Sequence, residues 1–311
     1  MHSVDKNFFP GWTRKAITFS IDDGNIQYDK KFIDIVKPYG IFGTFNLCTP
    51  LRSGLSAEEY REFYRGFEIA NHCKHHPVTL DPSANYHVYD TPLDRENADI
   101  EGIYPHDKVE GMHYVFRGKS WVSAAGTDVY NRLADECRQE LEEIFGDGSV
   151  KGLVWPHGCC YDDNILRHMK NEGYLYIRYT TRKSTDFSMP ETLYHIGLNG
   201  RFCNLPEIGD AFELEPDDGE LKLLTFGVHS ADYERGETWG ELADFCRKFG
   251  NRPGEYWSAT NSEIFEYYLA LGEILVNDDG IVNPTELEIY VKIDGKKIRL
   301  SPKTTLKFAC L

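Results

Sequence analysis

The sequence predicts an α/β fold in which parallel strands form a closed or nearly closed barrel. Segments typical of strands alternate with segments that have the apolar spacing of helices along most of the 311 residues. This alternation favours a parallel sheet, because a parallel connection usually passes through a helix. The number of such units indicates a (β/α) barrel, and the length suits one large domain or two ordinary domains.

The first part of the chain predicts three strands with a helix between each pair. The strand segments are rich in β-branched and aromatic residues, and the helix segments repeat apolar residues at intervals of three and four. Ser56 and Glu59 form a capping box, which marks the start of a helix. The predicted elements are a strand at 15–21, a helix at 30–37, a strand at 43–48, a helix at 56–64 and a strand at 67–71.

The alternation is interrupted after the third strand. Residues 81–121 are rich in Pro, Asp, Tyr and Gly and show no sustained period. A loop of this length in a compact domain is usually functional, so we expect an insertion here. The predicted elements that follow are helices at 127–145, 163–171, 239–249 and 262–271 and strands at 151–155, 174–179, 221–228 and 255–259.

The end of the chain has a different pattern. Two strand-like segments, 286–293 and 296–300, flank Asp294 and Gly295, a pair that favours a tight hairpin turn. A further strand is predicted at 304–309. We therefore expect a barrel over residues 1–279 and a small antiparallel β extension of the same unit over residues 280–311.

Composition and charge exclude several classes of protein. The formal net charge is −16, so the chain is repelled by phosphate backbones and is not expected to bind nucleic acid. No apolar run approaches the ~18 residues needed to span a membrane, and residues 1–7 lack the apolar stretch of a signal peptide. The eight cysteines contain no Cys-x-x-Cys pair. We interpret them as reduced thiols of a cytoplasmic protein.

Two groups of polar residues lie at the ends of predicted strands. Asp22 and Asp23 follow the first strand, and His72, His75 and His76 follow the third. The carboxyl ends of parallel strands face the active site, so the two groups can meet in space. Two imidazoles and one carboxylate make a divalent metal site with open positions. His72 pairs with His76 at i,i+4, on one face of a helical turn, or with His75 at i,i+3, and spacing alone does not choose between them.

Three segments resemble motifs of the polysaccharide deacetylases, the family 4 carbohydrate esterases that include chitooligosaccharide deacetylases. Residues 19–24 (Phe-Ser-Ile-Asp-Asp-Gly) are similar to the first motif, Thr-Phe-Asp-Asp-Gly. Residues 71–77 (Asn-His-Cys-Lys-His-His-Pro) resemble the second, His-(Ser/Thr)-x-x-His-Pro. Residues 223–229 resemble the last motif, an apolar strand that ends in His. The order and spacing agree over about residues 15–271, and they imply a distorted, incomplete (β/α) barrel.

The resemblance implies a metal site. It selects Asp23, His72 and His76 as ligands and leaves His75 outside. The implied cofactor is one divalent ion, zinc first, with cobalt, nickel and manganese as alternatives. Such an ion polarises an amide carbonyl and lowers the pKa of a water.

The resemblance also implies catalytic roles. Asp22 is the expected general base, and His229 is expected to protonate the leaving amine. A backbone N–H near His157 is expected to contact the developing oxyanion. Because neighbours on a strand point to opposite faces, Asp22 and Asp23 can both serve only where the strand turns, and Gly24 permits that turn.

The sequence departs from the family pattern in several places. Residues 154–158 read Val-Trp-Pro-His-Gly where the family has Arg-x-Pro-Tyr-Gly, so the arginine that orients the base is missing. Cys73 replaces a hydroxyl residue, and the fourth motif is not legible near residues 178–187. We expect Arg178 or Arg182 to supply the missing charge, because both lie at the end of a strand next to the site.

The leading functional prediction is metal-dependent hydrolysis of a C–N amide bond, with an N-acetyl group on an amino sugar or oligosaccharide as the substrate. One alternative is hydrolysis of a small amide or cyclic ureide, over which the 81–121 insertion closes. Another is a catalytically silent carbohydrate-binding protein, although the intact Asp22 argues against it. The expected partner is a carbohydrate or small molecule, without nucleic acid or membrane, and a homo-oligomer is left open.

Overall fold

The structure is a computed structural model. It describes residues 2–79, 88–89, 100–101, 110–117, 120–158, 160, 162–183 and 185–310. Seven parallel strands form its main sheet in the order β13-β2-β3-β4-β10-β11-β12, and a short eighth strand, β14 (Trp257–Ser258), also pairs with β2. The seven strands are β2 (Lys15–Asp22), β3 (Gly43–Leu47), β4 (Glu68–Asn71), β10 (Gly152–Val154), β11 (Tyr176–Arg182), β12 (Ile196–Leu198) and β13 (Lys222–His229).

The two edges of this sheet approach each other without full pairing. A single parallel bridge joins Gly200, just after β12, to Phe226 of β13. The N–H of Asn199 also donates to the carbonyl of Thr225 at 2.8 Å. The sheet is therefore a nearly closed barrel with one weak seam, and the predicted distorted, incomplete (β/α) barrel is confirmed.

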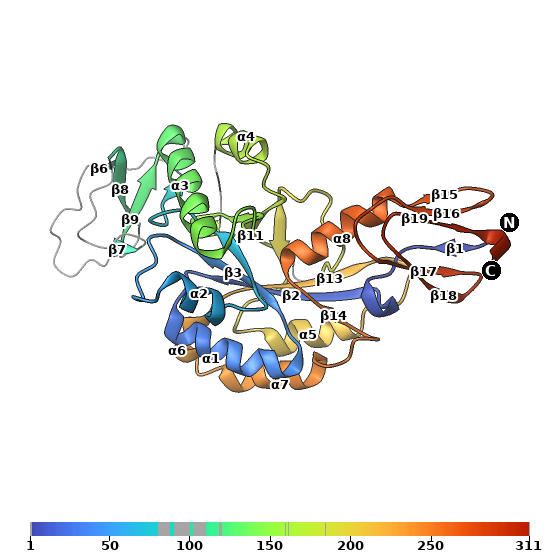
Figure 1. Cartoon of the computed structure of the whole chain (residues 1–311). Coiled ribbons are helices and arrows are strands. Elements are labelled where there is room, and N and C mark those ends of the chain that lie inside the picture. The colour runs from blue at the N-terminus through green and yellow to red at the C-terminus, as the bar shows by residue number, and fades with distance from the viewer. Residues whose placement is uncertain are drawn as a thin grey trace.

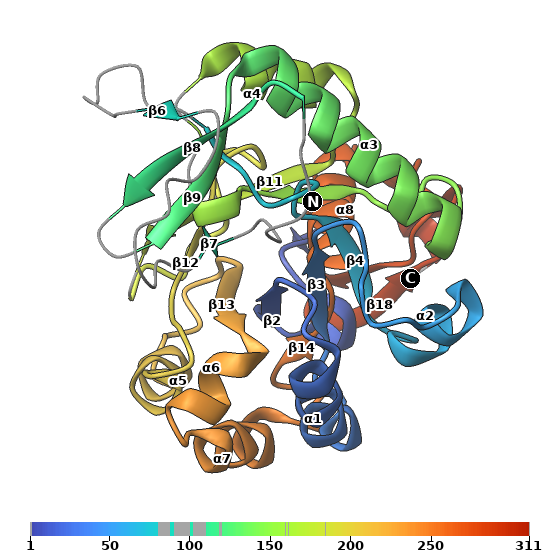
Figure 2. The ribbon, with the colours of Figure 1, turned by 90° about the vertical axis from the view of Figure 1, so that its left-hand side faces the viewer.

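Helices cover both sides of the barrel (Figures 1 and 2). Helices α1, α5, α6 and α7 lie together on one side, and α3 and α4 lie on the opposite side (Figure 2). Among the described residues, no helix is long and apolar enough to cross a membrane. The helices are α1 (Ile26–Val36), α2 (Ala57–Phe63), α3 (Thr127–Phe145), α4 (Asp163–Asn171), α5 (Leu205–Glu213), α6 (Ser230–Arg235), α7 (Trp239–Phe249) and α8 (Asn261–Glu273).

The alternation of residues along β2 explains how the barrel places polar groups inside. Ile17, Phe19 and Ile21 pack in the hydrophobic core shared with α1. The intervening residues face the barrel interior, because successive side chains of a strand point to opposite faces. Asp22 therefore closes an inward-facing polar row at the carboxyl end of the strand.

The predicted insertion contains a sheet of its own. Residues 112–117 and 120–125 form an antiparallel hairpin, so the last part of the expected loop over 81–121 is regular structure. The register partners Val115 and Val122 are both buried and belong to one small hydrophobic cluster. Residues 81–87, 90–99, 102–109 and 118–119 lie outside the described residues. The strands of this sheet are β5 (Val78–Thr79), β6 (Val88–Tyr89), β7 (Ile100–Glu101), β8 (Met112–Arg117) and β9 (Ser120–Ala125).

Two small antiparallel sheets lie at the other end of the molecule, where both termini are found (Figure 1). The predicted hairpin around Asp294 and Gly295 is present, with Ile293 opposite Lys296. One sheet also takes up β1 near the N-terminus, and the other takes up β15, which precedes residue 280. The division of the chain at residues 279 and 280 stays a prediction. The strands are β1 (Val4–Asp5), β15 (Leu275–Val276), β16 (Gly280–Asn283), β17 (Ile289–Ile293), β18 (Lys296–Leu300) and β19 (Thr304–Lys307).

Candidate active site

The carboxyl ends of three barrel strands bring the sequence-predicted polar residues together. Asp22 is the last residue of β2, and Asp23 follows it. His72 is the first residue after β4, and His229 is the last residue of β13. Strands β13, β2, β3 and β4 are consecutive neighbours in the sheet. Residues that are about 200 positions apart in the chain therefore share one site.

Asp23, His72 and His76 form a compact set of donor atoms. The two Nε2 atoms of His72 and His76 are 3.2 Å apart. Oδ1 of Asp23 lies 3.5 Å from Nε2 of His72 and 3.6 Å from Nε2 of His76. Ligands held at zinc-ligand distances in a tetrahedron are about 3.3 Å apart. The three atoms thus have the spacing of one face of a tetrahedral site, and the donor set fits a divalent ion.

The protonation of the two imidazoles also fits metal binding. Nδ1 of His72 lies 2.8 Å from the carbonyl of Val154. A carbonyl only accepts, so Nδ1 carries the proton and Nε2 presents a lone pair to the cluster. Burial lowers the pKa of His76 to about 3, which keeps its ring neutral. Burial raises the pKa of Asp23, but the imidazoles of His72, His76 and His229 around it outweigh burial and hold that pKa below its usual range.

Tight turns, and not a helix, bring these ligands together. Asp23, Cys73, His75, His76 and His157 all have positive φ, between 51° and 80°. Non-glycine residues rarely adopt this region, and such conformations gather at functional sites. The interpretation of His72 and His76 as one face of a helical turn is therefore wrong. The chain reverses at Cys73 and again at His75, so that both rings point to the same place.

Asp22 lies beside the metal-type donors in a strongly polar pocket. Nη2 of Arg178 donates to both of its carboxylate oxygens, at 2.5 and 2.6 Å. Nδ2 of Asn46 donates to Oδ1 at 2.7 Å. Burial alone would raise the pKa of Asp22, but Arg178, with His72 and His229, outweighs burial and lowers it. Asp22 is therefore ionised and held in one orientation.

Arg178 lies next to the position where the family motif has its arginine. Val154 stands at that position, and it is the register partner of Arg178 across the pairing of β10 with β11. The guanidinium of Arg178 is only 1% exposed. Gly227 makes room for it, because a Cβ there would lie 2.9 Å from Nη1. The charge thus reaches Asp22 from the neighbouring strand. The side chain of Arg182 lies outside the described residues.

His229 approaches the site from β13. Its Nε2 is 3.6 Å from Oδ2 of Asp23, and its Nδ1 is 2.9 Å from Oδ2 of Asp232. Burial alone would lower the pKa of His229, but Asp232, Asp22 and Asp23 raise it to about 9. The ring is therefore protonated at neutral pH and half exposed, as a proton donor to substrate must be.

His157 and His75 flank the donor cluster without joining it. The ring of His157 lies 4.7 Å from that of His76, in a 3-10 turn over Pro156–Gly158. His75 donates its backbone N–H to the carbonyl of Thr49 at 2.9 Å, and it is absent from the group of donors that the described residues bring together. The hydroxyl of Ser123 on β9 donates to the carbonyls of His75 and His76, at 3.2 and 3.3 Å.

Sequence reasoning missed four residues of this site. Asn46 contacts Asp22, Asp232 contacts His229, Ser123 contacts the carbonyls of His75 and His76, and Cys48 places a sulfur among the possible donors. Two of them had a readable signal. Asp232 follows His229 by three residues, and Cys48 is the last residue of the second predicted strand. Ser123 had none, because its role depends on the pairing of β9 with β5.

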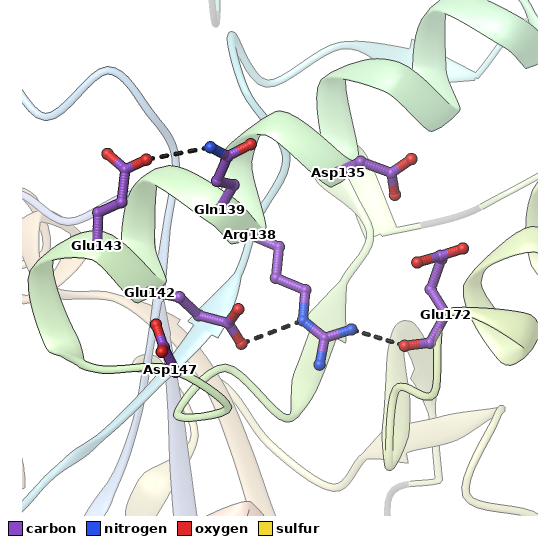
Figure 3. A pocket seen from close by; sticks show the side chains of 7 residues that line it. All are labelled: Asp135, Arg138, Gln139, Glu142, Glu143, Asp147 and Glu172. Carbon is purple, nitrogen blue, oxygen red and sulfur yellow. Dashed lines mark hydrogen bonds and ion pairs between the residues drawn. The ribbon is translucent and has the colours of Figure 1, made fainter.

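A second cluster of polar residues lies on the surface and has no residue in common with the candidate active site. A pocket between α3 and the end of α4 is lined by six polar or charged side chains around Arg138, among them Glu142 and Glu172 (Figure 3). Arg138 donates to Glu142 at 3.3 Å and to the carbonyl of Glu172 at 2.7 Å. Its charge is already partnered, so the strand ends remain the candidate active site.

Comparison with known proteins identifies the family of this chain. The family model described as polysaccharide deacetylase matches residues 11–177. The chain belongs to the polysaccharide deacetylase family. The matched region contains Asp22, Asp23, His72 and His76 and ends one residue before Arg178. A search of curated proteins finds no match.

Several solved structures are similar to this polysaccharide deacetylase family member. The Xyl-CE4 domain of a multidomain xylanase from the hindgut metagenome of Trinervitermes trinervoides is 13% identical, with 82% of this chain and 92% of that chain covered and a TM-score of 0.46. The peptidoglycan deacetylase PdaC from Bacillus subtilis is 15% identical, with 83% of this chain and 95% of that chain covered and a TM-score of 0.44. A mutant of BA3943, a CE4 family pseudoenzyme from Bacillus anthracis, is 11% identical, with 81% of this chain and 67% of that chain covered and a TM-score of 0.43. Similarity at this level assigns no activity or residue to this chain.

Members of the polysaccharide deacetylase family are hydrolases that act on amide bonds of N-acetylated sugars, and pseudoenzymes also occur among them.

Proposed function

We propose that this protein is a metal-dependent hydrolase that removes the acetyl group from an N-acetylated amino sugar or oligosaccharide. The observation that carries the proposal is the pairing of a complete donor triad with an oriented carboxylate. Asp23, His72 and His76 have the spacing of a zinc site. Asp22 lies beside them, fixed by Arg178 and Asn46.

A divalent ion held by the triad supplies a Lewis acid for the amide carbonyl and lowers the pKa of a water. Asp22 accepts the proton of the attacking water, and its lowered pKa keeps it ionised for this task. Its strong ion pair with Arg178 fixes the carboxylate in place, as a general base requires. In the family motif the arginine stands on the strand that corresponds to β10, at the position of Val154. Here Arg178 of the neighbouring strand β11 supplies the positive charge.

His229 donates a proton to the leaving amine. Its raised pKa, about 9, keeps the ring protonated at the pH where Asp22 is ionised. Asp232 holds Nδ1, which leaves Nε2 as the donating atom on the side of Asp23. Asp22 and His229 are register partners at the ends of the adjacent strands β2 and β13. A base with a lowered pKa and an acid with a raised pKa in one site can form an acid–base pair. We also assign the backbone N–H near His157 to the oxyanion.

These features argue for catalysis and not for a silent binding protein. A binding role has no need of an ionised, oriented carboxylate beside a metal site. Breaking a buried ion pair such as Asp22 with Arg178 costs about 3–5 kcal/mol, so its members are constrained together. The intact pair is what an active enzyme retains.

Release of acetate tests the proposal. The zinc-loaded protein is incubated with N-acetylglucosamine, its β-1,4-linked oligomers and a set of simple N-alkyl acetamides, and acetate is measured. We expect release from at least one sugar substrate, loss after chelation and recovery after zinc is restored. Release only from the simple amides would contradict the sugar assignment. No release from any amide by protein that holds one zinc per chain would contradict catalysis.

A further inference from the structure

A fourth metal-type donor lies at the triad. Sγ of Cys48 and the donor atoms of Asp23, His72 and His76 all lie within 4.8 Å of one another. The thiol is partly buried, and it donates to the carbonyl of His72 at 3.2 Å. The sulfur of Cys48 therefore lies close to the three possible metal ligands and contacts the backbone of one of them, His72.

The topology of the sheet explains why Cys48 is there. Strands β2, β3 and β4 are consecutive parallel neighbours, and β3 lies in the middle. The first residue beyond each of them is a metal-type donor: Asp23 after β2, Cys48 after β3 and His72 after β4. The register sets Cys48 level with His72, because Leu47 pairs with Asn71, and one residue beyond the level of Asp23, because Asp22 pairs with Asn46.

We propose that Cys48 is a fourth protein ligand of the metal ion, so that this centre is an Asp-His-His-Cys site. This inference rests on the proposed metal-dependent function. A zinc site with one sulfur and one nitrogen ligand places these two atoms about 3.6 Å apart. Sγ of Cys48 lies at most 4.8 Å from the other donor atoms. A movement of about 1 Å would therefore bring it to the sulfur–nitrogen separation of a zinc site. Coordination of Cys48 would release the thiol proton to solvent.

A sulfur ligand changes which ions the site accepts. Thiolate is a soft ligand and favours zinc and cobalt(II), whereas carboxylate and imidazole alone also suit manganese. The structure therefore assigns this centre a preference for thiophilic ions. If the sulfur of Cys48 binds the metal, the bound metal protects Cys48 from alkylating reagents.

Cobalt(II) spectroscopy tests the proposal without an assay of activity. We expect the cobalt-loaded wild type to show visible d–d bands and, in the near ultraviolet, an intense thiolate-to-cobalt charge-transfer band. Cys48→Ser keeps the d–d bands and loses the charge-transfer band. Cys203→Ser, which removes an exposed thiol outside the site, keeps both. Zinc binding weakens in Cys48→Ser, and manganese binding changes little.

The outcomes separate this proposal from the proposed function. Visible d–d bands without a charge-transfer band in the wild type overturn the sulfur ligand and leave the triad in place. A charge-transfer band that survives in Cys48→Ser also overturns it. Failure of the wild type to bind cobalt overturns both the triad and the fourth ligand.

A measurement on the wild type alone covers the case in which Cys48→Ser does not fold. Zinc is expected to slow alkylation of Cys48 by iodoacetamide, as read by peptide mass spectrometry. Cys203 on the surface is expected to react equally with and without zinc. Equal rates at Cys48 in the two states, with zinc shown to be bound, overturn the proposal.

Discussion

The two ends of the barrel both hold polar side chains, but they use them differently. At the carboxyl ends of the strands, two imidazoles and a carboxylate direct their acceptor atoms at one shared point. At the amino ends, Glu68 of β4 accepts hydrogen bonds from Thr44 at 2.7 Å, Tyr176 at 3.1 Å and both the backbone N–H and the hydroxyl of Ser262.

The difference lies in whether donors and acceptors match. At the amino end every acceptor of Glu68 meets a donor, and Ser262 belongs to the first turn of α8, so this cluster fastens the helix to the barrel. A satisfied network of this kind rigidifies a fold. At the carboxyl end acceptors face acceptors, which is stable only with a proton or a cation between them. The unmatched end is therefore the functional one.

The comparison predicts its largest effect for Asp22→Asn. The substitution removes the base and preserves the shape of the side chain, so hydrolysis falls by about 10²–10⁴-fold. The metal content stays near that of the wild type, because Asp23 and not Asp22 belongs to the donor set. The free energy of unfolding falls by about 3–5 kcal/mol, because Arg178 loses its buried partner. Steady-state acetate release and metal analysis on the same samples check this. A variant that turns over near the wild-type rate would show that another group takes the proton.

Arg178→Met tests the ion pair behind the base. Loss of the guanidinium leaves the Asp22 carboxylate buried without its main partner, which costs about 3–5 kcal/mol in the free energy of unfolding. The pKa of Asp22 also rises, since Arg178 is the main group that lowers it. The acidic limb of the pH–rate profile therefore moves to higher pH. Arg178→Lys is the matched control, and an unmoved acidic limb in both variants would separate Arg178 from the base.

Glu68→Gln tests the opposite end of the same strands. The amide places an NH₂ group against groups that donate to Glu68, so we expect a loss of about 1–3 kcal/mol in the free energy of unfolding. Metal content and the rate per folded molecule stay unchanged. Urea unfolding and acetate release measure the two quantities. If Glu68→Gln lost metal or turnover with its fold intact, the two ends would not be separate in function.

Asp232→Asn has the smallest expected effect. The pKa of His229 is raised to about 9, with Asp232 as the first of the groups that raise it. Its loss lowers that pKa by about one unit, since one charged hydrogen bond is removed. His229 must be protonated to act, so activity is lost earlier as pH rises, and the alkaline limb moves to lower pH. A profile measured between pH 6 and 10 reads this shift, and an unmoved alkaline limb would assign it to another group.

The strongly periodic parts of the fold could be predicted from the sequence. Helix α3 spans Thr127–Phe145 and α7 spans Trp239–Phe249, the bounds that their apolar spacing predicts. The short elements α5, α6 and β12 were missed, because their form depends on neighbours and not on their own pattern. The β8–β9 hairpin was missed for the same reason.

The candidate site also has features that the sequence predicts and features that it does not. Asp22, Asp23, His72 and His229 stand at strand ends that the sequence marks clearly. The left-handed turns at Cys73 and His75 were not predictable, because cysteine gives no signal of positive φ and histidine only a weak one. The contact of Arg178 with Asp22 was anticipated only as one of two candidates, because the sequence does not show the register of β11 against β10.

Metal content of the histidine variants tests the central claim most directly. The wild type, His76→Ala and His75→Ala are loaded with zinc, dialysed and analysed for metal per chain. We expect about one ion in the wild type and in His75→Ala, since His75 lies outside the donor cluster, and strong loss in His76→Ala. Loss of the ion from His75→Ala with retention in His76→Ala would contradict the account.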